Sequence, residues 1–267
     1  MKGNTILAER QIQAVVFDLA ETLLNFGRFQ TFRLFWKAAK ITYAYLREHE
    51  QPVGSFQFYV LHFLLRLRWA YTIGIVCDRD FNSLEAIRRI GLRHGFRLSD
   101  DQWEELAWLW YKPVRDIART ENDMADTLCR LKRMGLQLGL LSNTFVHASA
   151  LERHMEELGW LHCLEIRLYS YQFPFRKPDH RIFREAVRRL QIPLERTVYV
   201  GDNPRNDIRP ALKLGMHAVM KRAYTNEGKR IPERAWVIDR ISEVPGVIER
   251  ILSDDRGGQY EAVPQSA

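Results

Sequence analysis

The sequence predicts a three-layer α/β fold, in which a parallel sheet is covered by helices on both faces and an α-helical segment is inserted near its start. Three observations predict it. Over the second half of the chain, short apolar runs alternate with segments of helical periodicity, as strands and crossover helices do in parallel sheets. One further apolar run stands apart near the N-terminus. The stretch between them, residues 24–118, holds most of the chain's aromatic residues and no convincing run of strands.

The first apolar run, Ala14–Phe17, predicts a buried strand that ends at Asp18. Apolar residues then recur at intervals of three and four, which predicts one buried face of an amphipathic helix. This face comprises Phe29, Phe32, Trp36, Ala39, Tyr43 and Leu46. Further on, Ser99 and Gln102 have the spacing of a capping box before another helix. We expect the aromatic residues here to fill a small helical bundle, with an apolar substrate pocket or a partner surface as alternatives.

From about residue 119, helices and strands alternate regularly. Helices are predicted near residues 124–134, 148–158, 182–190 and 208–212. Strands are predicted at residues 138–141, 163–168, 197–200, 217–220 and 236–238. We therefore expect an α/β core formed by residues 1–23 and 119–252, a helical cap at 24–118, and a disordered polar tail at 253–267.

The composition limits the class of protein. Hydrophobic residues make up 46% and charged residues 27%, which excludes a fibrous or fully disordered chain. The net charge of +7 comes with no basic run longer than two residues, so we expect no nucleic-acid partner. The most apolar stretch, residues 56–77, is interrupted by His62, Arg66 and Arg68, so membrane contact is not expected. The first residues lack the apolar run of a signal peptide, and we expect a cytoplasmic protein.

The cysteines give no sequence signal for a metal site or a disulfide framework. They are few, widely separated and odd in number: Cys77, Cys129 and Cys163. We expect small buried side chains in a reducing compartment. The oligomeric state is not indicated by the sequence.

Polar side chains stand where the predicted strands end. Asp18 follows the first strand, Ser142-Asn143 ends the second, and Asp202 follows a later one. Asp207 falls in the first turn of the next predicted helix, and Lys177 precedes Pro178, which is expected to start a helix. In an open α/β sheet, ligands bind beyond the carboxyl ends of the strands. Clustered carboxylates suit Mg²⁺, and a lysine and a hydroxyl beside them suit a phosphoryl group.

Four segments resemble the motifs of the haloacid dehalogenase (HAD) superfamily, in the branch with a helical cap inserted after the first motif. They are Asp18-Leu19-Ala20-Glu21-Thr22, Leu140-Leu141-Ser142-Asn143, Lys177-Pro178-Asp179, and Gly201-Asp202 with Asp207 five residues further on. All four occur in the family's order, each on the element where the family has it. The resemblance covers the core and implies a Rossmann-like sheet; the cap matches by position and helical character alone.

The resemblance implies a role for each residue of the site. Asp18 is expected to take the phosphoryl group as an aspartyl-phosphate, while Lys177 neutralises charge beside it. The implied Mg²⁺ ligands are Asp18, the backbone carbonyl of Ala20, Asp202 and Asp207. The implied substrate-binding residues are Ser142, Asn143 and Lys177, and the implied catalytic residues are Asp18, Lys177 and Ser142.

The chain departs from the family pattern at Ala20, where family phosphatases carry a second Asp that protonates the leaving group. Glu21 is a possible substitute, although neighbours in an extended segment point opposite ways. Three functions stay open. They are a Mg²⁺-dependent phosphohydrolase of a small phosphorylated metabolite with weakened acid catalysis, a non-catalytic module that binds a phosphorylated ligand or a protein partner, and a phosphonatase-like C–P hydrolase. The phosphonatase-like function requires a lysine in the cap. The cap lysines of this chain, Lys37, Lys40 and Lys112, do not lie at the position where the phosphonatases of the family have theirs. A dehalogenase is disfavoured because that subgroup has Tyr in place of Ala20.

Overall fold

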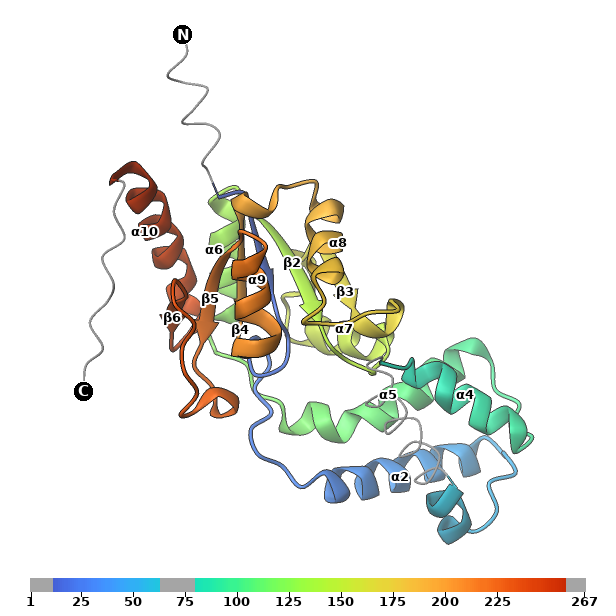
Figure 1. Ribbon diagram of the computed structural model, residues 1–267. Coiled ribbons are helices and arrows are strands. Elements are labelled where there is room, and N and C mark those ends of the chain that lie inside the picture. Colours follow the sequence, from blue (N-terminus) through green and yellow to red (C-terminus); the bar gives the residue numbers. More distant parts are fainter. Residues whose placement is uncertain (1–11, 63–79, 258–267) are drawn as a thin grey trace.

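A computed structural model describes residues 12–62 and 80–257 of the chain (Figure 1). In this described part, six strands form one parallel sheet with the order β3-β2-β1-β4-β5-β6. The strands are β1 (Ala14–Phe17), β2 (Gln137–Ser142), β3 (Ile166–Tyr169), β4 (Thr197–Gly201), β5 (His217–Lys221) and β6 (Trp236–Ile238). Helices flank the sheet on both faces (Figure 1). The α/β fold predicted from the sequence is confirmed.

Alternate residues of β1 face the two layers of helices. Val15 and Phe17 belong to an apolar cluster with α6 (Met124–Arg133), α7 (Ala148–Glu157) and α10 (Val244–Gly257). Ala14 and Val16 belong to a second cluster on the other face, with α8 (His180–Leu190) and α9 (Arg209–Lys213). Both clusters are buried, so β1 lies at the centre of the molecule with one helical layer on each side.

The register of the central strands aligns their carboxyl ends. Phe17 lies beside Leu140 of β2 and Val200 of β4, and the amide of Asp18 continues the ladder by donating to the Val200 carbonyl at 2.8 Å. The last residues of β2 and β4, Ser142 and Gly201, therefore end at the same edge as Asp18.

Three long helices lie between β1 and α6 in the sequence and pack around an apolar cluster of their own. They are α2 (Thr31–Glu48), α4 (Ser83–Arg93) and α5 (Asp100–Ile117). A further helical segment at 56–62 lies between α2 and α4 in the sequence. The cluster includes Ala39, Leu46, Tyr59, Ile87, Trp103 and Leu106. The capping box at the start of α5 is present: Ser99 Oγ accepts from the Gln102 amide, and Gln102 Oε1 accepts from the Ser99 amide. These helices lie at the end of the sheet to which the strands point (Figure 1).

The predicted buried face of the first helix is wrong over its first half. Phe29, Phe32 and Trp36 are 44%, 67% and 36% exposed, whereas Leu34 and Ala38 are buried. The inward face also contains Thr42, whose Oγ1 donates to the Ala38 carbonyl and accepts from the Tyr59 hydroxyl. Thr42 can face inward because these hydrogen bonds satisfy its hydroxyl. A polar residue on the buried side makes the apolar pattern of the sequence miss the true buried face. Ala39 and Leu46 of the predicted face are buried.

Several element boundaries differ from the predicted ones. Leu161–Cys163 forms a 3₁₀ turn, so β3 begins at Ile166. The helix expected to start at Pro178 begins at His180, because the Asp179 carboxylate caps it by accepting from the Arg181 amide at 2.9 Å.

The last helix, α10, continues to Gly257, past the expected boundary at 252. Val247, Ile248 and Ile251 hold this helix against the core through buried side chains. The rest of the predicted tail, residues 258–267, lies outside the described residues, as does Cys77. None of the helices in the described part combines the length and apolarity that a membrane span requires.

Candidate active site

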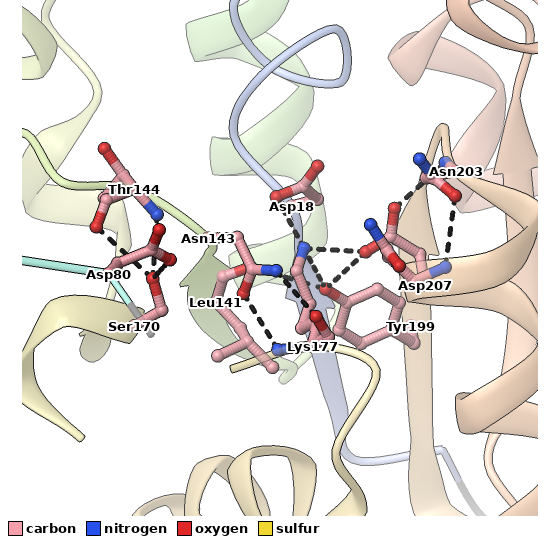
Figure 2. Close-up of polar contacts among 11 residues, drawn as sticks. Asp18, Asp80, Leu141, Asn143, Thr144, Ser170, Lys177, Tyr199, Asn203 and Asp207 are labelled. Atoms are coloured by element: carbon pink, nitrogen blue, oxygen red, sulfur yellow. Dashed lines mark hydrogen bonds and ion pairs between the residues drawn. The ribbon is translucent and has the colours of Figure 1, made fainter. Parts of the chain in front are cut away.

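Lys177 lies at the centre of the predicted site (Figure 2). Its Nζ donates to Asp18 Oδ1 at 2.7 Å, to Asp207 Oδ1 at 2.6 Å and to the Tyr199 hydroxyl at 3.0 Å. Lys177 is 3% exposed, and burial alone would lower the pKa of its ammonium group. The two carboxylates outweigh burial and hold the pKa of Lys177 well above its usual value. The lysine is therefore a fixed positive charge inside the site.

Three carboxylates cluster at this point, two of them in contact with Lys177, and one positive charge cannot balance all three. Asp18, Asp202 and Asp207 are buried, and their oxygen atoms lie within 4.8 Å of one another. Burial raises the pKa of Asp18 to about 7, against the opposing effect of Lys177, and Asp207 and Asp202 raise it further. Burial and the charge of Asp207 raise the pKa of Asp202 to about 6. An additional cation would allow all three to ionise, and an oxygen-only donor set fits Mg²⁺.

Asp207 is held in place by the backbone that follows β4. A π-helical turn, Pro204–Ile208, lies between the strand and α9, where the sequence predicted the first turn of a regular helix. This turn brings Asp207 back toward the strand end, where the Asn203 amide donates to Asp207 Oδ2 at 2.9 Å. A side chain at Gly201 would place its Cβ 2.7 Å from Asp207 Cβ and Cγ, so the close approach requires glycine.

Asn143 fixes the loop that carries the lysine. Its Nδ2 donates to the Lys177 carbonyl at 2.8 Å, and the Lys177 amide donates to Asn143 Oδ1 at 2.9 Å. The Asn143 side chain thus anchors the Lys177 backbone to the end of β2. Ser142, the last residue of β2, is buried at the same edge, and Ala20 is exposed just beyond Asp18.

The side chain of Glu21 stabilises a backbone turn. Its backbone φ is 57°, in the left-handed region, and its side chain is buried. Oε1 accepts from the Phe26 amide at 2.9 Å and the Gly27 amide at 3.2 Å. The Glu21 carboxylate therefore closes the turn that leads from the core into α2, and its Oε1 is already bonded on that side.

Sequence reasoning missed the residues that support the carboxylates. Tyr199 on β4 was counted as part of an apolar strand, yet its hydroxyl accepts from Lys177 Nζ and shares its single proton between Asp207 Oδ1, at 3.2 Å, and the Leu141 carbonyl. Because a buried tyrosine hydroxyl needs a hydrogen-bond partner, the sequence could have indicated that Tyr199 contacts a polar group. Thr225 donates to Asp202 Oδ2, and Asn226 Nδ2 donates to the Asp202 carbonyl at 2.7 Å. Nothing in the local sequence pattern singles out Thr225 or Asn226.

A carboxylate from the segment before α4 reaches the same edge of the sheet. Asp80 Oδ2 accepts from the Ser170 hydroxyl at 2.5 Å, and Ser170 Oγ accepts from the Thr144 amide at 2.8 Å. Asp80 Oδ1 also pairs with Arg176 at 3.0 Å. Asp80 thus reaches the loop that follows Asn143 through Ser170 (Figure 2) and the loop that carries Lys177 through Arg176.

The family model of haloacid dehalogenase-like hydrolases matches residues 12–215, a range that includes every motif of this site. The chain belongs to the haloacid dehalogenase-like hydrolase family. The resemblance of the four motifs to the haloacid dehalogenase superfamily is confirmed.

The relatives include phosphatases and a dehalogenase. The glyceraldehyde 3-phosphate phosphatase of Methanothermobacter thermautotrophicus is 37% identical over 139 residues, which is 49% of this chain and 60% of that protein. The (S)-2-haloacid dehalogenase of Pseudomonas putida is 25% identical over 210 residues, 73% of this chain and 78% of that protein. The chain spans less than two thirds of the length of the archaeal phosphatases that it matches.

Solved structures share the fold over most of the chain. A 2-haloacid dehalogenase from Pseudomonas syringae superposes with a TM-score of 0.58 at 23% identity, covering 90% of this chain and 99% of that one. A HAD phosphatase from Thermococcus onnurineus has a TM-score of 0.54 at 20% identity, covering 88% and 97%. At these identities the likeness shows the fold alone.

Proposed function

We propose that this protein is a Mg²⁺-dependent phosphohydrolase that acts on a small phosphorylated metabolite through Asp18. One observation carries the proposal: three buried carboxylates cluster at the carboxyl edge of the sheet, and a buried lysine pairs with two of them. A phosphoryl group brings negative charge that must be neutralised as it transfers, and a lysine beside a metal-binding cluster suits that task. Relatives named glyceraldehyde 3-phosphate phosphatase and phosphoserine phosphatase support phosphate hydrolysis as the reaction class.

In the proposed reaction, Asp18 attacks phosphorus with the oxygen that does not accept from Lys177. The bond from phosphorus to the leaving oxygen breaks, and an aspartyl-phosphate forms. Water then attacks that phosphorus, releases inorganic phosphate and restores the carboxylate. Lys177 fixes the orientation of Asp18 through its 2.7 Å contact, and Asn143 fixes Lys177. Ser142 is the proposed donor to a phosphoryl oxygen.

The proposed Mg²⁺ ligands are Asp18, Asp202, Asp207 and the carbonyl of Ala20. When bound, the ion would neutralise charge on the phosphoryl oxygens. Tyr199, Asn203 and Thr225 hold the carboxylates in position by hydrogen bonds. This support keeps the oxygen atoms clustered and reduces the reorganisation that binding would require.

Ala20 decides which substrates are favoured. Its methyl group gives no proton to a leaving oxygen, and the Glu21 carboxylate accepts the Phe26 and Gly27 amides instead. A general acid contributes about 10²–10⁴ in rate, most where the leaving group is strongly basic. We therefore propose an acyl phosphate or another phosphate with a weakly basic leaving group as the substrate class.

Dehalogenation of a 2-haloacid is the second candidate. A departing halide needs no proton, which suits Ala20, and the Pseudomonas putida relative matches 73% of the chain. Displacement of halide by a carboxylate needs no metal, however. The third buried carboxylate, Asp202, would then have no role in the reaction. The clustering of Asp202 with Asp18 and Asp207 therefore favours phosphoryl transfer.

A substrate screen with two proteins tests the proposal. Wild type and Asp18→Asn are incubated with acyl, aryl and alkyl phosphates, phosphonates and 2-haloacids, each with Mg²⁺ or with EDTA. The proposal expects Mg²⁺-dependent phosphate release by wild type and a loss of several orders of magnitude in the variant. Halide release would establish the second candidate. No turnover of any class would favour the non-catalytic binding module, which can be assayed by phosphate-dependent stabilisation.

A further inference from the structure

A second cluster of metal-ligating side chains lies away from the candidate active site. Cys129 comes from α6, and His162 and Cys163 come from the 3₁₀ turn Leu161–Cys163, just before the amino end of β3. These two cysteines show no metal-binding spacing in the sequence, because they are 34 residues apart and meet only when α6 packs beside the turn. The candidate active site lies at the carboxyl ends of the strands, so the two clusters are separate.

Two distances within this cluster are close to those between ligands of a tetrahedral zinc ion. Cys129 Sγ and Cys163 Sγ are 3.8 Å apart, and Cys163 Sγ is 3.5 Å from His162 Nε2. Zn–S bonds of about 2.3 Å and a Zn–N bond of about 2.05 Å at tetrahedral angles place sulfur atoms about 3.8 Å apart, and sulfur about 3.6 Å from nitrogen. All three ligand atoms lie within 4.8 Å of one another.

Charge and exposure also fit a thiolate-bound divalent cation. Two thiolates and one neutral imidazole balance a 2+ ion, so the burial of Cys163 leaves no net charge inside the protein. His162 is exposed, which leaves the fourth position open to water. Thiolate and imidazole ligands select Zn²⁺ over the hard Mg²⁺ ion, so this cluster does not compete with the carboxylates for Mg²⁺.

We propose that Cys129, His162 and Cys163 bind one Zn²⁺ ion, with water as the fourth ligand. Binding replaces two thiol protons by the metal: Zn²⁺ and two thiols give a zinc dithiolate and two released protons. The bound ion ties α6 to the turn before β3. Because it binds only the folded chain, Zn²⁺ stabilises the core without taking part in chemistry at Asp18.

Cobalt titration under a thiol-free reductant tests the site. We expect one equivalent of Co²⁺ to give the thiolate-to-cobalt charge-transfer band and the strong visible bands of tetrahedral Co²⁺, and Zn²⁺ to displace it. Cys129→Ser should abolish these bands, whereas Cys77→Ser, the same change at the third cysteine, should keep them. Asp202→Ala should also keep them, which separates this site from the carboxylate cluster.

A second variant tests the site at an exposed position, where the substitution should not unfold the protein. His162 is exposed, so His162→Ala should leave the metal-free melting temperature unchanged and weaken Zn²⁺ binding by at least about tenfold. The proposal is overturned if wild type shows no charge-transfer band, or if Cys129→Ser keeps the band at full intensity. It is equally overturned if His162→Ala binds Zn²⁺ as tightly as wild type.

Discussion

The methyl group of Ala20 stands at the point where the proposed reaction needs a proton. Asp18, Lys177 and the two other carboxylates are clustered and buried, so the groups for nucleophilic attack and charge neutralisation are in place. Departure of a basic alkoxide would still be slow, because protonation in the transition state is absent. In the proposed reaction, the same deficiency would slow the attack of water on phosphorylated Asp18. On this proposal, position 20 limits the rate and shapes the choice of substrate.

Restoring a carboxylate at position 20 should change the preference between leaving groups. We expect Ala20→Asp to raise alkyl-phosphate turnover by up to about 10²–10⁴, and aryl-phosphate turnover much less. Steady-state rates of both proteins on both substrate classes at saturating Mg²⁺ measure this difference. Equal gains on the two classes would mean that protonation is not what the wild type lacks.

Removing the central lysine should cost both activity and stability. Lys177→Met leaves Asp18 and Asp207 buried without their positive partner, and breaking a buried pair in this way costs about 3–5 kcal/mol. Urea unfolding in the absence of metal measures this loss. The control Lys213→Met changes an exposed lysine on α9 and should shift stability by less than about 0.5 kcal/mol. Equal stability of Lys177→Met and wild type would contradict the pairing described here.

At the residue scale, the sequence predicts the residues of the proposed site better than the residues that hold them in place. Asp18, Lys177, Asp202 and Asp207 were predicted to meet because parallel strands end at one edge, and they do meet. Thr225, Asn226 and Asp80 were not predicted. Their contacts depend on how loops fold back from β5 and from the segment before α4, and no periodicity encodes that path.

Among the elements, α5 of the helical insertion packs against α7 of the core. Arg115 pairs with Glu157 across this contact at 2.5 Å, and Arg153 lies 4.3 Å above the ring of Trp108. Beneath these surface pairs, a buried hydrogen bond of 2.9 Å joins Tyr111 to His154. Burial lowers the pKa of His154 to about 4, with Arg115 adding to the effect.

This histidine makes stability depend on pH. The unfolded chain binds a proton at His154 near pH 6.5, whereas the folded chain resists protonation until about pH 4. Stability is therefore complete above pH 6.5 and is lost as the pH falls toward 4, by about 3 kcal/mol from this group. Urea unfolding between pH 7 and 4 should show a smaller pH-dependent loss in His154→Gln than in wild type. The control His180→Gln alters an exposed histidine and should keep the wild-type profile; an unchanged profile in His154→Gln would contradict the assignment.

Element prediction succeeded where the apolar period matched burial and failed where it did not. β1 was predicted to the residue, because all four of its side chains are buried and apolar. The face of α2 was misplaced, because Thr42 satisfies its hydroxyl locally and faces inward. The π-helical turn before α9 has no counterpart in a period of 3.6, and it is held by Asn203 and the contact at Gly201.

At the scale of the whole molecule, the strand order places β1 between β2 and β4, with their carboxyl ends at one edge. That arrangement brings the proposed nucleophile, the lysine loop and the carboxylates proposed to bind metal together from segments as far apart as residues 18 and 207. The helical insertion begins directly after Asp18 and returns Asp80 to the same edge. The fold thus concentrates the proposed chemistry at a single edge and leaves the cysteine cluster beside the amino end of β3.

Direct detection of the phosphorylated enzyme tests the central claim. Wild-type protein is mixed with an acyl phosphate and Mg²⁺, quenched in acid within the first turnover, digested, and analysed by mass spectrometry. Because Ala20 slows the attack of water, we expect the aspartyl-phosphate to accumulate in a burst, with one phosphoryl group on the peptide that contains Asp18. EDTA should prevent it, and Asp18→Asn should show none. Substrate turnover without phosphoryl label at Asp18 would contradict the account.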